Sequence, residues 1–116
     1  MREPNRDKGR LKDILEAADY VSSFVNGLDY EEFLADKLRY FAILKNVEII
    51  GEASYMISLP LKESHPEVPW VDIIKMRHVL VHGYSSILPE LLWDTAVNEV
   101  PKYKVQVKAI LDEIGL

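Results

Sequence analysis

Apolar residues recur at helical spacing along most of the chain. The spacing predicts a first helix from Leu11 to Val25, which the Asn26-Gly27 pair ends. Residues 31–58 contain no proline and one glycine, and two apolar stripes overlap there. A helix that is apolar around most of its circumference belongs in the centre of a bundle or in a subunit interface. The two stripes are Leu34, Leu38 and Phe41, and then Ile43, Val47, Ile50, Ser54 and Ile57.

The second half of the chain continues the helical pattern after an interruption. Residues 59–69 contain three prolines and predict a surface loop in which His65 faces solvent. A short helix follows from Trp70 to about His82, and a last helix starts near Pro89, with a kink predicted at Pro101. No stretch alternates as a strand would. The pattern therefore predicts an all-α, up-and-down bundle of four to five helices over residues 11–116, after a flexible lead-in over residues 1–10.

Composition narrows the class of protein. The 116 residues are 48% hydrophobic, as expected for one globular domain, and the absence of cysteine excludes disulfide scaffolds, thiolate metal sites and cysteine nucleophiles. With 14 Lys and Arg against 19 Asp and Glu, the net charge of −5 gives no general attraction for nucleic acid. Any such contact must be local. The chain lacks an apolar run of about 18 residues and an N-terminal signal pattern, which predicts a cytoplasmic protein without a membrane segment.

The densest polar cluster on a predicted helix is the segment RHVLVHGY, residues 77–84. His78 and His82 share one helix face, whereas Arg77 and His82 are about 140° apart around an ideal helix. These two groups converge only if the helix end unwinds or a second copy contributes. Beside RNA, a neutral imidazole can accept the proton of a ribose 2′-OH while a guanidinium holds the phosphate, so this chemistry needs no metal. DNA lacks the attacking hydroxyl.

Other interpretations of the same residues remain open. Histidines near a helix C-terminus are favoured by the helix dipole, and Arg77 is then an ordinary surface cation. A zinc pair of the His-x-x-x-His type usually has a glutamate after the first histidine, where this chain has Val79, so we predict no metal site. Phosphate-binding and dinucleotide-binding glycine motifs are also missing, and no cofactor is predicted.

Three further features carry possible chemistry. Glu48 and Glu52 lie one turn apart and repel each other unless a cation lies nearby, and Arg77 is a plausible partner, either in a structural ion pair or in a catalytic site. Asp36 stands where a carboxylate stabilises a helix N-terminus. Trp70, at the head of its helix, is expected to be a packing anchor.

Three stretches of the sequence together resemble a known family. They are EIIGEA at residues 48–53, VPW at residues 68–70 and RHVLVHGY at residues 77–84. The chain resembles the HepT-like family of the HEPN superfamily, the ribonuclease toxin half of HepT/MntA toxin–antitoxin pairs, over nearly its whole length. The resemblance implies a metal-independent endoribonuclease with a helical-bundle fold, acting on RNA as a homodimer whose two Arg-x4-His motifs line a shared cleft.

The resemblance also implies roles for individual residues. Arg77 matches the phosphate-binding arginine and His82 the general base and acid, whereas His78 stands where the family usually has asparagine. Tyr84 matches the tyrosine to which an MntA-like nucleotidyltransferase antitoxin adds AMP, which would bring bulk and negative charge into the cleft. The supporting residues are His78, Glu48, Glu52 and Asp36. The alternatives are a non-catalytic nucleotide- or substrate-binding subunit that partners a minimal nucleotidyltransferase, and a purely structural dimer.

Overall fold

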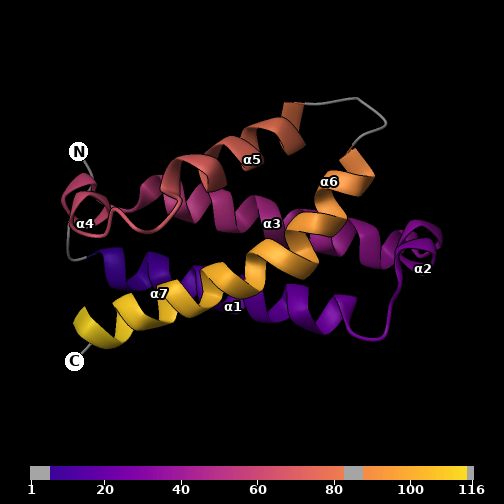
Figure 1. Ribbon diagram of the computed structural model, residues 1–116, viewed down its shortest axis with the longest axis horizontal. Coiled ribbons are helices and arrows are strands. Elements are labelled where there is room, and N and C mark those ends of the chain that lie inside the picture. Colours follow the sequence, from indigo (N-terminus) through magenta and orange to yellow (C-terminus); the bar gives the residue numbers. More distant parts are fainter. Residues whose placement is uncertain (1–5, 83–87, 115–116) are drawn as a thin grey trace.

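The computed structural model describes residues 6–82 and 88–114, and every regular element in these ranges is a helix. The main helices are α1 (Asp7–Val25), α3 (Lys37–Met56), α5 (Trp70–His82) and α7 (Val100–Ile114), with the shorter α2 (Tyr30–Ala35), α4 (Leu59–Ser64) and α6 (Leu88–Asp94) between them. Neighbouring main helices alternate in direction (Figure 1). The all-α prediction is confirmed. The described residues contain more helices than the predicted four to five, because α2 and α4 are additional short elements.

Helix α3 lies between α1 and α5, and α7 packs on α1 (Figure 1). This arrangement confirms the central position predicted for the helix within residues 31–58. The second apolar stripe of that segment faces the core, whereas Leu38 and Phe41 of the first stripe remain 88% and 60% exposed. The side chains that α3 contributes to the core include Ile43, Val47, Ile50 and Ala53.

The segment predicted as one helix over residues 31–58 is two helices. Asp29 starts α2 through a capping box with Glu32, and Asp36 ends α2 and starts α3. The Asp36 carboxylate accepts a hydrogen bond from the Arg39 amide at 3.1 Å, which satisfies one of the free N–H groups of the first turn. Asp36 is therefore a helix cap, a more specific form of the helix N-terminal role expected from the sequence.

The N-terminal helix begins earlier than predicted. α1 starts at Asp7, so residues 7–10, which the sequence placed in a flexible lead-in, are helical. The Asp7 side chain is only 4% exposed and accepts hydrogen bonds from the Ser58 amide at 2.8 Å and the Ser58 hydroxyl at 2.5 Å. The apolar pattern does not reveal this start, because a polar contact with Ser58, 51 positions away, stabilises it. No apolar stripe marks these residues.

The predicted loop over residues 59–69 contains α4, which Ser58 caps and in which Pro60 occupies the first turn. His65 is buried, 9% exposed, and not solvated as expected, because its ring contacts the Leu61 carbonyl and its own carbonyl accepts a hydrogen bond from the indole of Trp70 at 3.0 Å. Trp70 is a packing anchor, as predicted, with its ring edge-on to Tyr103.

The last predicted helix is interrupted. A π-helical turn, Thr95–Glu99, separates α6 from α7, and the amide of Val100 donates to the carbonyl of Thr95. The interruption ends two residues before Pro101, whose ring nitrogen cannot donate to the helical ladder. Figure 1 shows the chain changing direction here, in agreement with the predicted kink. Within the described part of the chain, no helix combines the length and hydropathy that a membrane span requires.

Candidate functional site

The best-defined feature of the RHVLVHGY segment is the position of Arg77 against α3. A Cβ atom placed on Gly51 would lie 2.3 Å from the Cβ of Arg77 and 3.0 Å from its Cγ. Real carbon atoms do not approach so closely, so α5 can cross α3 at this point only because residue 51 has no side chain. Gly51 thereby fixes the base of the Arg77 side chain on the surface of α3.

The guanidinium of Arg77 is held through its Nε atom by Glu52, the residue that follows Gly51 on α3. The Nε atom of Arg77 lies 2.9 Å from Oε1 of Glu52, and the two side chains are 35% and 54% exposed. The predicted pairing of Arg77 with the acidic strip of this helix is confirmed for Glu52. At this exposure the pair contributes little to stability, about 1 kcal/mol at most, so its main effect is to orient the guanidinium.

Glu48 is partly exposed and lies one turn before Glu52 on the same face of α3. α5 runs antiparallel to α3, so the part of α5 that follows Arg77 and ends at His82 runs along the part of α3 that precedes Glu52. Glu48 belongs to that part of α3. Glu48 and Glu52 of α3 therefore both lie along the segment of α5 from Arg77 to His82. One of them already contacts the arginine.

The structure does not bring all the predicted site residues together within one copy. Asp36 precedes Glu52 by sixteen positions, which corresponds to about 24 Å along a helix, and it caps the opposite end of α3. His78 is exposed beside Arg77 on α5. The side chain of His82 lies outside the described part of the structure, as do Gly83 and Tyr84 entirely, so the predicted convergence of Arg77 and His82 remains a prediction.

Two residues of this region were missed by the sequence reasoning. Gly51 received no role, although a glycine inside a helix costs stability relative to alanine and so points to a packing reason. Arg10 was placed in the lead-in, yet it lines a hollow of about 170 Å³ together with Glu52, next to the Arg77 contact. Within residues 6–82 and 88–114, the buried Nε atom of Arg10 has no hydrogen-bond partner. No sequence signal near Arg10 would have indicated this position.

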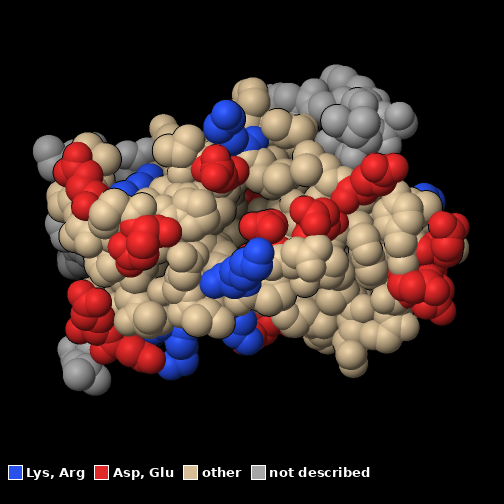
Figure 2. All heavy atoms as spheres, viewed as in Figure 1, with Lys and Arg blue, Asp and Glu red and all other residues tan. Residues whose placement is uncertain are grey.

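The distribution of charge agrees with a local site. Figure 2 shows one face of the molecule, on which acidic and cationic side chains are interspersed and form no continuous basic surface. On this face, in a chain with a net charge of −5, a contact with a phosphate backbone would depend on a few placed cations. Arg77 is such a cation, because Gly51 fixes the position of its Cβ and Glu52 fixes the position of its Nε.

The fold and the site define a small helical-bundle protein. In it, Arg77 of α5 is held against the central helix α3, where its guanidinium can bind an anion. Residues 14–110 match the family model described as Ribonuclease HepT-like. The chain therefore belongs to the HepT-like ribonuclease family, and the predicted identification as a ribonuclease of this family is confirmed.

Relatives support the same assignment. The chain is 40% identical over 103 residues to a protein of Methanocaldococcus jannaschii named as a candidate RNase, covering 89% of this chain and 94% of that protein. It is 39% identical over 97 residues to the probable ribonuclease HepT of Thermococcus cleftensis, covering 84% and 88%. A candidate RNase of Caldanaerobacter subterraneus is 34% identical over 103 residues, covering 89% and 92%. No solved structure matches the chain significantly.

Proposed function

We propose that this protein is an endoribonuclease toxin of the HepT/MntA type that cleaves RNA through attack of a ribose 2′-OH. Arg77 binds the scissile phosphate and His82 accepts the proton of the attacking hydroxyl. The observation that carries the proposal is the fixed position of Arg77, seated on Gly51 and oriented by Glu52 at 2.9 Å. Membership of the HepT-like ribonuclease family makes RNA the substrate to test first.

The reaction needs a base, an acid and a stabilised phosphate. The imidazole of His82 takes the 2′-OH proton, and the 2′-oxygen forms a bond to phosphorus. The bond to the 5′-oxygen breaks, and this oxygen leaves with a proton supplied by an imidazolium. The products are a 2′,3′-cyclic phosphate and a 5′-hydroxyl. Arg77 stabilises the charge that gathers on the phosphate oxygens during this exchange.

Glu52 is a positioning residue in this scheme. It contacts Nε of Arg77, and the four hydrogens on the two terminal guanidinium nitrogens are not needed for that contact. These hydrogens can form a bidentate contact with a phosphate. An arginine held in this way loses less side-chain freedom when it binds its anion than an unrestrained one would.

The shape of α3 supports a homodimer. Leu38, Phe41, Lys45, Glu48 and Glu52 follow one another at intervals of three and four residues, so they share one face of the helix. Leu38 and Phe41 at one end of this face are 88% and 60% exposed, which is costly for large apolar side chains unless a partner covers them. A second copy bound on this face would bring its own Arg77 region towards the first. The angular separation of Arg77 and His82 would then be bridged between subunits.

Regulation by a nucleotidyltransferase antitoxin completes the proposal. The motif places Tyr84 two residues after His82, so an AMP group on its phenolic oxygen would add a negative charge beside the phosphate-binding residues. Repulsion between this charge and the RNA backbone would prevent binding. Both proteins would act in the cytoplasm.

The test is induced expression of the wild type, His82→Ala and Arg77→Ala in cells without a partner, reading growth and RNA ends together. The wild type should arrest growth and produce fragments with 2′,3′-cyclic phosphates, and neither variant should do so. Lys108→Ala is the matched control, because it removes an exposed cation of an ion pair on α7 and should behave as wild type. Harmless expression of soluble wild type would contradict the nuclease and favour a binding subunit.

The regulatory part has its own test. Tyr84→Phe should cleave RNA but escape neutralisation when the antitoxin is co-expressed, because the phenolic oxygen is the acceptor. Mass spectrometry of the co-expressed wild type should locate AMP on the peptide that contains Tyr84. AMP on a different residue would refute this assignment.

A further inference from the structure

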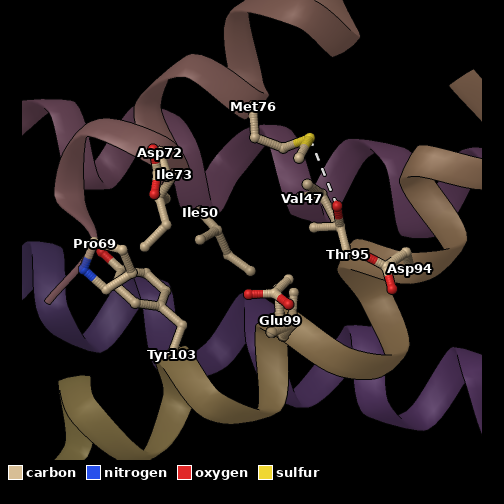
Figure 3. Close-up of a pocket in the computed structure, with 11 residues that line it drawn as sticks. Val47, Ile50, Pro69, Asp72, Ile73, Met76, Asp94, Thr95, Glu99 and Tyr103 are labelled. Carbon is tan, nitrogen blue, oxygen red and sulfur yellow. Dashed lines mark hydrogen bonds between the residues drawn. The ribbon is translucent and has the colours of Figure 1, made fainter.

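A second hollow lies on the other side of α3 from the Arg77–Glu52 pair. It has a volume of about 260 Å³ and lies between α3, α5 and the segment from α6 to α7 (Figure 3). Ile50 lines it, and Ile50 and Glu52 point about 200° apart around the helix. The floor is apolar and includes Val47, Ile50, Ile73, Met76 and Val100.

The mouth of this pocket is acidic. Asp72 of α5, and Asp94 and Glu99 of the opposite wall, line it and are exposed, and the lining residues that the structure describes include no lysine or arginine. Figure 3 shows the Glu99 carboxylate directed towards the middle of the pocket, facing Ile50. Acidic side chains are also visible on this face of the molecule, between α5 and the helices opposite (Figure 2).

The polar groups of the inner wall are already used within the protein. The Thr95 hydroxyl donates to the Leu91 carbonyl at 2.8 Å and lies 3.6 Å from the sulfur of Met76. The Tyr103 hydroxyl lies 2.6 Å from the Ser54 hydroxyl, which donates to the Ile50 carbonyl. A ligand would therefore meet an apolar interior below the three carboxylates.

The π-helical turn accounts for two of these acidic residues lining the same hollow, although only the Glu99 carboxylate is directed towards its middle (Figure 3). Asp94 and Glu99 are five positions apart, which in a regular α-helix would separate them by about 140° around the axis. In the π-helical turn the amide of Val100 bonds to the carbonyl five residues before it, so residues five apart lie close to one side. Pro101 explains why the ladder shifts here, and a second acidic group at the pocket is the consequence.

We propose that this pocket binds a small aliphatic amine in its protonated form. The alkyl chain would lie on the apolar floor, and the ammonium group would lie beside the Glu99 carboxylate, with Asp72 and Asp94 on opposite sides of the mouth adding to the negative field. The present contacts of these carboxylates leave room for a cation. Among the described residues, Asp94 accepts a hydrogen bond from Asn98 at 2.7 Å, and Glu99 lies 3.8 Å from the amine of Lys102, a side chain that is 75% exposed.

The size of the hollow limits the ligand. At about 260 Å³ it lies just below the range of roughly 300 to 1,000 Å³ typical of sites for drug-sized molecules, so a short alkyl chain fits better than a nucleotide. A carboxylate or phosphate ligand is disfavoured, because it would bring a fourth negative charge to the mouth. The proposal is independent of the ribonuclease reaction, since none of the pocket residues belongs to the Arg77 site.

The experiment compares three probes of equal chain length against the full-length protein by NMR chemical-shift titration at neutral pH. Hexylammonium should bind saturably and shift amides of α5 and of the π-helical turn. Hexanol should bind more weakly, and hexanoate should not bind. Binding of hexanol as tight as that of hexylammonium would overturn the proposal, as would the absence of saturable hexylammonium binding.

Substitutions of the three acidic residues test whether amine binding depends on their charge. Asp72→Asn, Asp94→Asn and Glu99→Gln should each weaken hexylammonium binding about twofold to fivefold, which is the range for exposed ion pairs, and about tenfold or more when combined. All three side chains are exposed, so the substitutions should leave the fold intact. Glu16→Gln on α1 and Arg77→Ala are the controls and should bind as wild type. Unchanged affinity in the combined variant would overturn the proposal.

Discussion

Gly51→Ala tests the close approach of α5 to α3 that seats Arg77. The new Cβ would lie 2.3 Å from the Cβ of Arg77, whereas ordinary contact begins at about 3.4 Å. The nearest neighbour is the first side-chain atom of Arg77, so no change of rotamer removes the clash. The two helices must separate locally by about 1 Å.

Two opposing effects set the change in stability. Alanine in place of glycine inside a helix is worth up to about 1 kcal/mol in favour of folding. Forcing a methyl group into a filled contact costs about 1 to 3 kcal/mol. We therefore expect Gly51→Ala to destabilise the protein by up to about 2 kcal/mol, and never to stabilise it by the full helix-propensity gain.

Gly9→Ala is the matched control. Gly9 is also helical, and a Cβ atom there would meet nothing within 4 Å, so only the propensity gain applies. Urea denaturation at one protein concentration should place the midpoint of Gly9→Ala at or above that of the wild type and that of Gly51→Ala below it. If both variants were equally stabilised, the inferred contact between Gly51 and Arg77 would be wrong.

The same displacement should affect function more than stability. A shift of about 1 Å at a group that holds a reacting phosphate can cost about a hundredfold in rate. We expect Gly51→Ala to lose most RNA cleavage at temperatures where circular dichroism shows it fully folded. Wild-type activity in the folded variant would show that the exact position of Arg77 does not matter for catalysis.

Three further predictions concern other contacts. Glu52→Gln should change the free energy of unfolding by less than about 1 kcal/mol but reduce kcat/KM for RNA about tenfold, because it removes the orientation of Arg77; a parallel loss of stability and activity would contradict a positioning role. Asp7→Ala should lower the free energy of unfolding by about 2 kcal/mol or more, because it leaves the buried amide and hydroxyl of Ser58 without their acceptor; an unchanged urea midpoint would refute this. Burial raises the pKa of the Tyr103 hydroxyl above its usual value, so the folded state favours the neutral hydroxyl. The resulting contribution to the free energy of unfolding is complete below pH 10 and is lost as the pH rises further. Between pH 9 and pH 11 the wild type should lose about 1.4 kcal/mol more than Tyr103→Phe, and equal losses would contradict the burial effect.

The apolar periodicity was a good guide wherever a helix is held by its buried face. The stripe of Ile43, Val47 and Ile50 was assigned to the core and is buried there. The same reasoning failed at Asp7 and His65, where polar contacts decide the structure. Asp7 is stabilised by Ser58, and His65 is covered by residues of α4 and α7, and neither contact leaves a periodic signal.

The site could be predicted in part. The pairing of Arg77 with the acidic strip followed from the repulsion between Glu48 and Glu52, and the contact with Glu52 confirms it. Asp36 was expected in the first turns of a helix, where its carboxylate favours the N-terminus, and the structure places it as the cap that precedes α3. Which glutamate binds the arginine could not be predicted, because it depends on how α5 crosses α3.

The sequence by itself determined the helical class, the central position of a helix within residues 31–58 and the family to which the chain belongs. These properties depend on local spacing and on short motifs, which the linear order of residues contains. Only the tertiary structure decided that Gly51 receives Arg77, that Arg10 and Glu52 line one hollow and that Asp94 and Glu99, at the two ends of a π-helical turn, line one pocket. Each of these depends on the distance and angle between packed helices, which side chains distant in sequence set together.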